Sequence, residues 1–446
     1  MFTYIKLKNF LSFKEVEFDF RDGNKGAKKF VSIYGENGSG KTNFVDSIAF
    51  LCNSVYSLSF AKEIDEVIEY AKKEKVSEHL IEMFVSNRNI LKQANRCRMV
   101  DCDESTYVEY GFKLKGHEGY YVLEFRDRFL YEKLYYFTGK QRGVLFEIAE
   151  DDKGITTNFS SKLFGNRKFK EDIEEEIRRF WGKHTLLSIL QKTFEDQNET
   201  YVRDSVLTHA LDALALASNT SVLIGPSSVS PVVNTNRTSC IKIMDLIEGE
   251  VAVSERKQLD YTEKILNDFF TQTYADIKDV YYRMHEDEGE IHYKLFVVKM
   301  IGGKLRDIEF TRESTGTKKI LKIVRYFLSA LCGMTVVMDA IDDGIHDLLL
   351  RNILTSMVDD ITGQLIVTTH NTFMMETINI KSVYVINIDY RGEKVVTCLD
   401  KFPRIQKTNN PRDMYLKGLF GGLPVVEELD FGEIKELLNA NLEGGD

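Results

Sequence analysis

The pattern of hydrophobic and polar residues predicts strands near the N-terminus. Apolar and polar side chains alternate over residues 2–20, which predicts two strands joined by a turn at 8–13. A short apolar run at 29–34 predicts a buried strand, and apolar residues recur at helical spacing from 44 to 52. Alternation resumes over 107–150, where we expect antiparallel strands that extend the same sheet.

The middle of the chain has mainly helical spacing. Residues 60–100 combine helical periodicity with many charges, as in a solvated helix, and residues 165–275 are mostly helical. The stretch 218–240 is rich in Ser, Thr, Asn and Pro, which predicts a loop. Strand spacing returns at 278–311. The helices lack sustained heptads, so we do not expect a long coiled-coil arm.

The last third of the chain mixes helical and strand patterns. An amphipathic helix is predicted directly after residue 319, and buried strands are predicted at 334–339 and 364–369. A hairpin is predicted at 382–399, with its turn at 389–393. This order of elements indicates an α/β fold with a mixed sheet.

The segment between the first buried strand and the first helix carries a phosphate-binding pattern. Residues 35–42 read GENGSGKT, which matches G-x-x-x-x-G-K-[ST]. Glycine residues let backbone N–H groups turn toward phosphate oxygens, and the helix N-terminus adds partial positive charge. Lys41 is expected to reach the β- and γ-phosphates of ATP, and the Thr42 hydroxyl to hold Mg²⁺. The nucleotide-binding residues predicted here are Asn37, Gly38, Ser39, Gly40, Lys41, Thr42 and Asn43.

A second motif supplies an acidic residue at the end of a strand. The strand at 334–339 ends in Asp339, whose carboxylate is placed to bind Mg²⁺ through water. The next residue is Ala340, which has no group that can orient or deprotonate water. We therefore expect the chain to bind ATP well and to hydrolyse it poorly. Asp342 and Asp343 could substitute only from offset positions.

These motifs, in this order, resemble the ATPase heads related to RecF, SMC and Rad50 proteins. The start I-K-L-K-N-F-L-S-F at 5–13 is followed by a strand and the phosphate-binding loop, as in those heads. The segment E-S-T-G-T-K at 313–318 resembles the signature loop of ABC-type ATPases, and residues 339–346 match a D-E-I-D-x-x-x-H form except at Ala340. The resemblance is to the AAA_15/AAA_21 group of compact ABC-type ATPases of prokaryotic anti-phage systems, similar to AriA of PARIS and to RloA- and AbiL-like ATPases.

The resemblance implies further site residues. Ser314 and Gly316 match the signature positions that cap the γ-phosphate held by another subunit, which implies a homodimer or higher homo-oligomer closed by ATP. His370 matches the switch histidine that contacts the γ-phosphate. Ala340 occupies the position of the catalytic glutamate. Its origin stays open between a substitution introduced into an active ATPase and a naturally slow or inactive one.

The glutamine loop of such sites is not identified by the sequence. Gln93, Gln141 and Gln191 are candidates without distinguishing context. The N-terminal hairpin is expected near the adenine, as in the resembled heads.

The resemblance also implies an organisation and a role. We expect an ABC-type P-loop ATPase head with a large, mainly helical insertion. The head would comprise 1–60, 107–160 and 278–425, with a helical segment at 61–106, an insertion at 161–277 and an acidic tail at 426–446. The expected role is a nucleotide-dependent switch that senses a phage protein and controls a separately encoded nuclease or toxin. A RecF-like DNA-repair ATPase is the alternative, and a stand-alone nuclease is disfavoured because no acidic metal-binding cluster stands out.

Composition narrows these expectations. The net charge of −10 argues against a surface built for non-specific nucleic-acid binding, although a local basic groove stays possible at 165–170. No run of 18 apolar residues and no signal-peptide pattern were recognised, so we expect a cytoplasmic protein without a membrane span. The six cysteines are scattered, which favours free thiols over a zinc site at Cys97 and Cys102. The acidic tail either docks a basic partner or is a solvated end.

Overall fold

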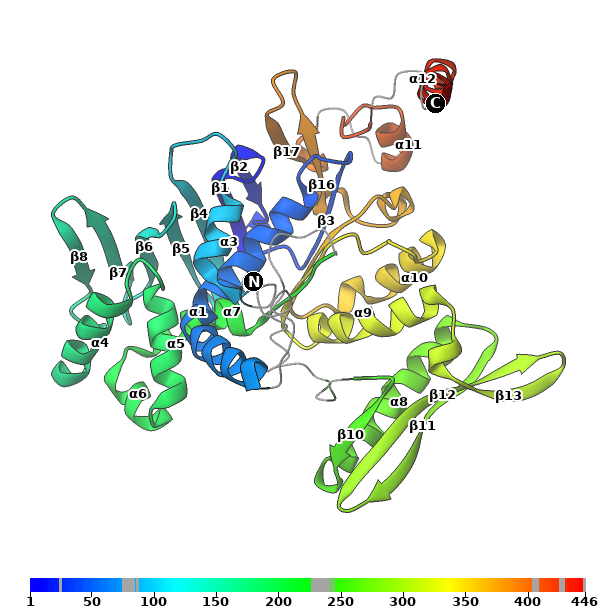
Figure 1. The fold of residues 1–446 in the computed structure, drawn as a ribbon, viewed down its shortest axis with the longest axis horizontal. Helices are drawn as coiled ribbons and strands as arrows, with labels where there is room; N and C mark the ends of the chain where they lie inside the picture. Colours follow the sequence, from blue (N-terminus) through cyan, green and yellow to red (C-terminus); the bar gives the residue numbers. More distant parts are fainter. Residues whose placement is uncertain are drawn as a thin grey trace.

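A seven-stranded antiparallel sheet forms one layer of the molecule (Figure 1). The computed structural model describes residues 1–23, 26–73, 85, 88–225, 241, 243, 245–402, 409–424 and 430–443. In this part of the chain the strand order is β2-β1-β4-β5-β6-β7-β8. The N-terminal strands and the antiparallel strands expected at 107–150 are confirmed, and they share one sheet. The phosphate-binding strand lies in a different sheet, so the expectation that 107–150 extends its sheet is wrong. The bounds are β1 (Phe2–Phe10), β2 (Phe13–Asp19), β4 (Thr106–Leu114), β5 (His117–Phe125), β6 (Phe129–Phe137), β7 (Arg142–Asp151) and β8 (Gly154–Phe159).

A second, mainly parallel sheet holds the phosphate-binding strand near its centre. Its order is β17-β16-β3-β15-β14-β9, and only β17 runs antiparallel to its neighbour. The carboxyl ends of its parallel strands therefore meet at one edge, where ligands of such sheets bind. The bounds are β3 (Phe30–Gly35), β9 (Thr220–Leu223), β14 (Thr335–Met338), β15 (Gln364–Thr368), β16 (Val383–Ile388) and β17 (Lys394–Cys398).

The prediction of a loop at 218–240 is wrong for the first residues of this stretch. Strand β9 lies there and pairs in parallel with β14, from Thr220 opposite Thr335 to Leu223 opposite Met338. A four-residue strand is too short to show a periodic pattern, so only its partner reveals it. Residues 226–240 of the expected loop lie outside the described residues.

Helix α1 (Lys41–Lys73) lies between the two sheets and starts at the phosphate-binding loop. The Phe50 ring lies 4.6 Å from that of Phe125 in the antiparallel sheet, and the Tyr110 hydroxyl donates to the Ser47 carbonyl. On its other side, α1 shares a core with apolar residues of β3, β14 and β15. A helix buried on all sides must be apolar all round. Residues Lys41–Ile64 accordingly have the length and hydropathy of a membrane span, contrary to expectation, yet 89% of that window is buried inside the fold.

A lobe of helices packs beside α1, as the spacing at 165–218 predicts. The Ser188 hydroxyl of α5 accepts hydrogen bonds from the Leu58 N–H and the Ser57 hydroxyl of α1. The basic stretch at 165–170 starts α4, where Arg167 and Lys170 pair with glutamates four residues on. That arrangement is typical of a solvated helix face. The bounds are α3 (Ile90–Cys97), α4 (Arg167–Phe180), α5 (Leu186–Asp196), α6 (Glu199–Ser205) and α7 (Thr208–Ser218).

A third sheet stands apart from the other two (Figure 1). Helix α8 (Arg256–Thr273) packs its buried Leu259, Leu266 and Phe270 against this sheet. The strands expected at 278–311 are present and form a sheet of their own with β10. The stretch 161–277 contains strands β9 and β10 besides its helices. Alternation reveals a strand without revealing its partner. The bounds are β10 (Glu248–Ala252), β11 (Ile277–Asp287), β12 (Glu290–Ile301) and β13 (Lys304–Glu309).

The remaining helices cover the parallel sheet and the C-terminal segment. Helix α9 carries the predicted amphipathic face, and its apolar side packs on β14 and β15. Helix α12 exposes an apolar stripe at Phe431, Ile434 and Leu438. The bounds are α9 (Thr315–Leu331), α10 (Asp347–Met357), α11 (Pro411–Leu416) and α12 (Phe431–Glu443), with 3₁₀ helices η3 (Val253–Glu255), η4 (Phe310–Arg312), η5 (Val358–Asp360), η6 (Thr372–Glu376), η7 (Ile380–Ser382) and η8 (Leu399–Lys401).

The cysteines only partly follow the expectation of free thiols. Cys52, Cys97, Cys102 and Cys398 are free, whereas Cys332 is disulfide-bonded.

Candidate nucleotide-binding site

The loop between β3 and α1 adopts a conformation that depends on its glycines. Gly38 and Gly40 have φ of 81° and 103°, which residues with a side chain rarely adopt. A Cβ atom at Gly40 would lie 2.7 Å from the Phe13 ring. The loop therefore needs glycine at position 40 both for its backbone angle and for the close approach of the N-terminal turn.

Lys41 points its ammonium group back into the loop. Its Nζ donates to the carbonyls of Gly35 (2.8 Å) and Glu36 (2.9 Å). Burial lowers the pKa of Lys41, while the carboxylates of Asp339 and Asp342 act in the opposite direction. An ammonium group held by two carbonyls of the phosphate-binding loop is suited to bind phosphate oxygens there.

The two predicted magnesium ligands lie side by side. The Thr42 hydroxyl donates to Oδ2 of Asp339 at 2.8 Å, and the Thr368 hydroxyl donates to Oδ1 of Asp339 at 2.6 Å. A hydroxyl and a carboxylate offer the hard oxygen ligands that Mg²⁺ prefers, with water and phosphate oxygens completing its shell. The residues present therefore fit a magnesium–nucleotide complex. No cluster of three or more His, Cys, Asp or Glu side chains suited to a metal occurs among the described residues.

Ala340 directly follows Asp339 and has an unusual backbone. Its φ is +46°, and its N–H donates to the Thr368 hydroxyl at 2.8 Å. Thr368 thus fixes both Asp339 and the residue that follows it. A methyl group at this position can neither accept a proton from water nor orient water.

The predicted switch histidine lies beside the same group of residues. The backbone N–H of His370 donates to Oδ2 of Asp342 at 3.0 Å. The other oxygen of this carboxylate, Oδ1, is buried without a hydrogen-bond partner among the described residues. Partial burial lowers the pKa of His370, and the charge of Lys41 lowers it further. The imidazole is therefore neutral near pH 7 and can donate or accept one hydrogen bond.

The signature residues lie on the surface at the start of α9. Ser314 caps this helix by accepting a hydrogen bond from the Thr317 N–H at 3.1 Å. A Cβ atom at Gly316 would lie 3.1 Å from the Gly344 carbonyl, so the loop contacts the segment that follows Ala340. No described contact joins Ser314 or Gly316 to the phosphate-binding loop of the same chain. The structure thus brings Lys41, Thr42, Asp339 and His370 together and leaves the signature pair outside.

Two residues of the site were not identified from the sequence. Thr368 precedes the predicted switch by two positions, and only its contact with Asp339 reveals its part. Lys394 of β17 donates to the Gly38 carbonyl at 2.8 Å and to the Ser12 hydroxyl. The Asn43 amide also donates to Ser12. A lysine in a hairpin gives no local signal of such a contact, because Gly38 lies 356 positions earlier.

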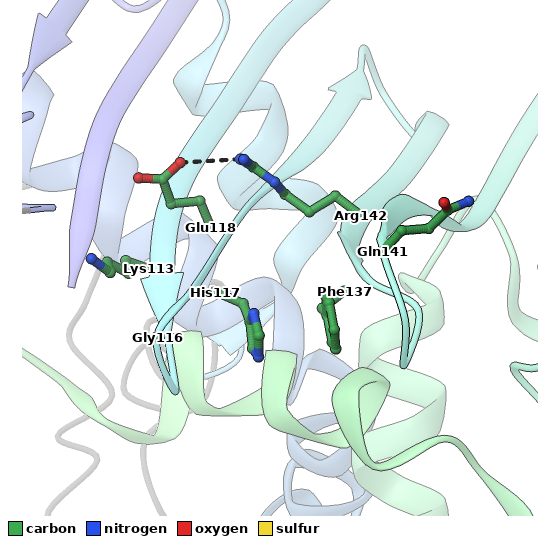
Figure 2. A pocket seen from close by; sticks show the side chains of 7 residues that line it. All are labelled: Lys113, Gly116, His117, Glu118, Phe137, Gln141 and Arg142. Atoms are coloured by element: carbon green, nitrogen blue, oxygen red, sulfur yellow. Dashed lines mark hydrogen bonds and ion pairs between the residues drawn. The ribbon is translucent and has the colours of Figure 1, made fainter. Parts of the chain in front are cut away.

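The described hydrogen bonds of the three candidate glutamines do not involve the nucleotide-binding residues. Gln93 accepts from Asn53, and the Gln191 amide donates to Glu195. Gln141 lies beside Arg142 in the turn between β6 and β7 (Figure 2), at a shallow pocket of about 430 Å³. Arg142 pairs there with Glu118 at 3.1 Å. These contacts do not identify a glutamine loop.

Two protein-family models match the chain. The family described as "AAA domain, putative AbiEii toxin, Type IV TA system" matches residues 138–376, more than half of the 446 residues. A second AAA-domain family matches residues 4–220.

The chain is also similar to SMC proteins. The chromosome partition protein Smc of Methanococcus voltae is 28% identical over 189 residues, which are 42% of this chain and 12% of that protein's length. The SMC head domain from Thermotoga maritima aligns over 89% of this chain and 98% of that one, with 14% identity and a TM-score of 0.37. An Smc head with an extended coiled coil, bound to the C-terminal domain of ScpA derived from Pyrococcus furiosus, covers 90% and 97%, with 13% identity and a TM-score of 0.40.

Proposed function

The chain belongs to the AAA-domain family that matches residues 138–376, and we propose that it is a nucleotide-dependent dimerisation switch of a prokaryotic defence system. Nucleotide binding and ATP hydrolysis are the general activities of AAA and SMC-like ATPases, and this chain has the corresponding loop at Gly35–Thr42. The switch, its trigger and its partner go beyond family membership and are argued below.

One observation supports the proposal: the phosphate-binding residues and the signature pair lie at different places on the chain, as two complementary halves of a shared nucleotide site would. Lys41, Thr42 and Asp339 form one half, linked by the hydrogen bond between Thr42 and Asp339. Ser314 and Gly316 form the other half, exposed or partly exposed at the N-terminus of α9, where backbone amides favour an anion. Two copies can therefore close on each other's nucleotide.

Each of these residues would contact a different part of the bound Mg-ATP. Lys41 and the loop amides would hold the phosphates of ATP, and Thr42 with Asp339 would hold Mg²⁺, which when bound neutralises phosphate charge. The neutral His370 would hydrogen-bond the γ-phosphate. Because the signature pair of the second copy would contact the same phosphate, ATP would favour the closed dimer by its differential affinity for that state.

Ala340 would make this switch slow to reset. Without a carboxylate beside the phosphate, water is not activated, so the closed state would outlast that of an ordinary ATPase. We infer that this chain binds ATP and hydrolyses it poorly.

The proposed biological role follows from the resemblance and from the family description, which names a toxin of a type IV toxin–antitoxin system. We propose that the dimer or a larger assembly acts in the cytoplasm, where it senses a phage protein and holds or releases a separately encoded nuclease or toxin.

A DNA-binding repair ATPase of the RecF and Rad50 kind is a second candidate. The 28% identity with an Smc over 189 residues supports it. DNA binding that requires ATP and weakens steeply with salt would favour this candidate, because phosphate contacts release counterions.

The test of the switch is the solution mass of the purified chain with and without Mg-ATP, with bound nucleotide measured in the same run. We expect a dimer or larger assembly that retains about one ATP per chain, as two trans-capped sites require. Lys41→Ala is the control and should stay monomeric and free of nucleotide. A parent chain that is monomeric under both conditions would contradict the proposal.

A further inference from the structure

Lys394 occupies a position that the motifs of the nucleotide site do not explain. It is the first residue of β17, on the hairpin that follows the predicted switch histidine. Its Nζ donates to the Gly38 carbonyl at 2.8 Å and to the Ser12 hydroxyl. One ammonium group therefore joins the phosphate-binding loop, the N-terminal turn and the last strand of the parallel sheet.

The surroundings of this ammonium group hold it in place. The ammonium group lies over the face of the Phe13 ring, with Nζ 5.6 Å from the ring centroid. A Cβ atom at Gly40 would lie 3.4 Å from Nζ and 2.7 Å from the Phe13 ring. The Asn43 amide donates to the same Ser12 hydroxyl. Loop, turn and lysine are thus packed closely enough that a shift of one displaces the others.

Within the described part of the chain, Lys394 has no carboxylate partner for its charge. No ion pair joins it to an acidic side chain among the described residues, and burial lowers its pKa. The adjacent Glu393 pairs instead with Lys14, at 2.9 Å. A half-buried cation without a counter-charge is stabilised when an anion binds nearby.

We propose that Lys394 is a positioning residue for nucleotide phosphates. Its hydrogen bonds fix the Gly38 carbonyl and the Ser12 hydroxyl, which holds the loop in one conformation, and its charge attracts the phosphates. This deepens the proposed function, because it rests on ATP binding at Gly35–Thr42. The chemical class of ligand is a polyphosphate, whichever base it carries.

The test compares three full-length variants in titrations with a fluorescent ATP analogue and in competition with inorganic tripolyphosphate. Lys394→Met keeps an aliphatic side chain against Phe13 and removes the charge. Lys394→Arg keeps the charge and the donors. Lys14→Met removes a neighbouring lysine that is paired with Glu393, and it is the matched control.

We expect Lys394→Met to weaken binding of both ligands about tenfold, the usual scale for a lost charge-assisted hydrogen bond. It should also reduce the salt dependence of binding. Lys394→Arg should stay within about threefold of the parent and Lys14→Met within about twofold. Thermal midpoints measured without ligand show whether the variants are folded.

Three results would overturn the assignment. One is Lys394→Met binding both ligands as tightly as the parent. Another is Lys394→Arg failing as badly as Lys394→Met, which would mean that a positive charge at this position does not account for the binding. The third is a loss for ATP but not for tripolyphosphate, which would place the effect on the base. A parent that binds neither ligand would contradict the proposed function as well, so the two failures are distinguishable.

Discussion

At the scale of single residues, Ala340 is the position from which we infer slow ATP turnover. Ala340 directly follows Asp339. The Thr368 hydroxyl accepts a hydrogen bond from the backbone N–H of Ala340 and donates one to the Asp339 carboxylate. The backbone at this position is therefore held by a hydrogen bond, while the side chain supplies no group that can activate water. The consequence can be measured directly.

Ala340→Glu should raise the rate of phosphate release from Mg-ATP by on the order of 100-fold, because a positioned general base contributes at least that much. Ala340→Gln has nearly the same size without a basic group and is the control. If the parent already turns over at roughly 1 per second or faster, the inference from Ala340 is wrong.

A second residue-scale effect concerns a buried carboxylate far from the site. Glu132 on β6 accepts hydrogen bonds from the N–H groups of Leu186 and Leu187 at the start of α5 and from the Tyr121 hydroxyl. Burial raises the pKa of Glu132 to about 7, despite these hydrogen bonds.

The folded state thus binds a proton at Glu132 that the unfolded chain releases between about pH 4.5 and pH 7. The free energy of unfolding should therefore fall as the pH rises through that window, by on the order of 3 kcal/mol from this group. Glu132→Gln should remove this slope in urea denaturation at pH 5 and pH 7.5. Glu147→Gln, at a carboxylate whose pKa is lowered chiefly by Tyr131, should not remove it.

At the scale of elements, a buried glutamine side chain links the start of the parallel sheet's strand β15 to the antiparallel sheet. The Gln364 amide, at the start of β15, accepts from the Phe2 N–H at 2.7 Å and donates to the carbonyls of Phe2 and Lys28 at 2.9 Å. This side chain therefore hydrogen-bonds backbone groups of both the first residue of β1 and the residue two positions before β3.

Gln364→Leu should lower the free energy of unfolding by about 3 kcal/mol, because it leaves buried backbone groups of Phe2 and Lys28 unpaired. Urea denaturation measures this. Gln191→Leu is the matched control, since that buried glutamine has its described hydrogen bond to a glutamate side chain and should cost less than about 1 kcal/mol. Equal losses would show that Gln364 is not a special link.

At the scale of the whole molecule, the proposal requires two chains for each complete site. A chain with Lys41→Ala lacks the phosphate-binding half, and a chain with Ser314→Arg has a blocked signature half. Neither should dimerise with Mg-ATP, but an equimolar mixture should form a heterodimer with one intact site and about one bound ATP per pair. Solution mass and nucleotide content measure this. Normal self-association of the Ser314→Arg chain would exclude capping in trans.

The sequence by itself determined the parts of the site that are contiguous. Gly35–Thr42 forms its loop from neighbouring residues, and the loss of the glutamate at Ala340 is visible in one motif. The α/β fold, the N-terminal strands and α9 follow from local periodicity, and the structure confirms them. These features depend on interactions within a few residues, which is why a pattern reveals them.

Only the tertiary structure decided which strands share a sheet and which distant side chains meet. Strand β9 joins the parallel sheet, whereas β11–β13 form a separate sheet with β10, and no pattern in the sequence indicates either assignment. Thr368 reaches Asp339, and Lys394 reaches Gly38, across 29 and 356 positions. Alternation of apolar and polar residues indicates which face of a strand is buried. It does not indicate which strand or loop packs against that face.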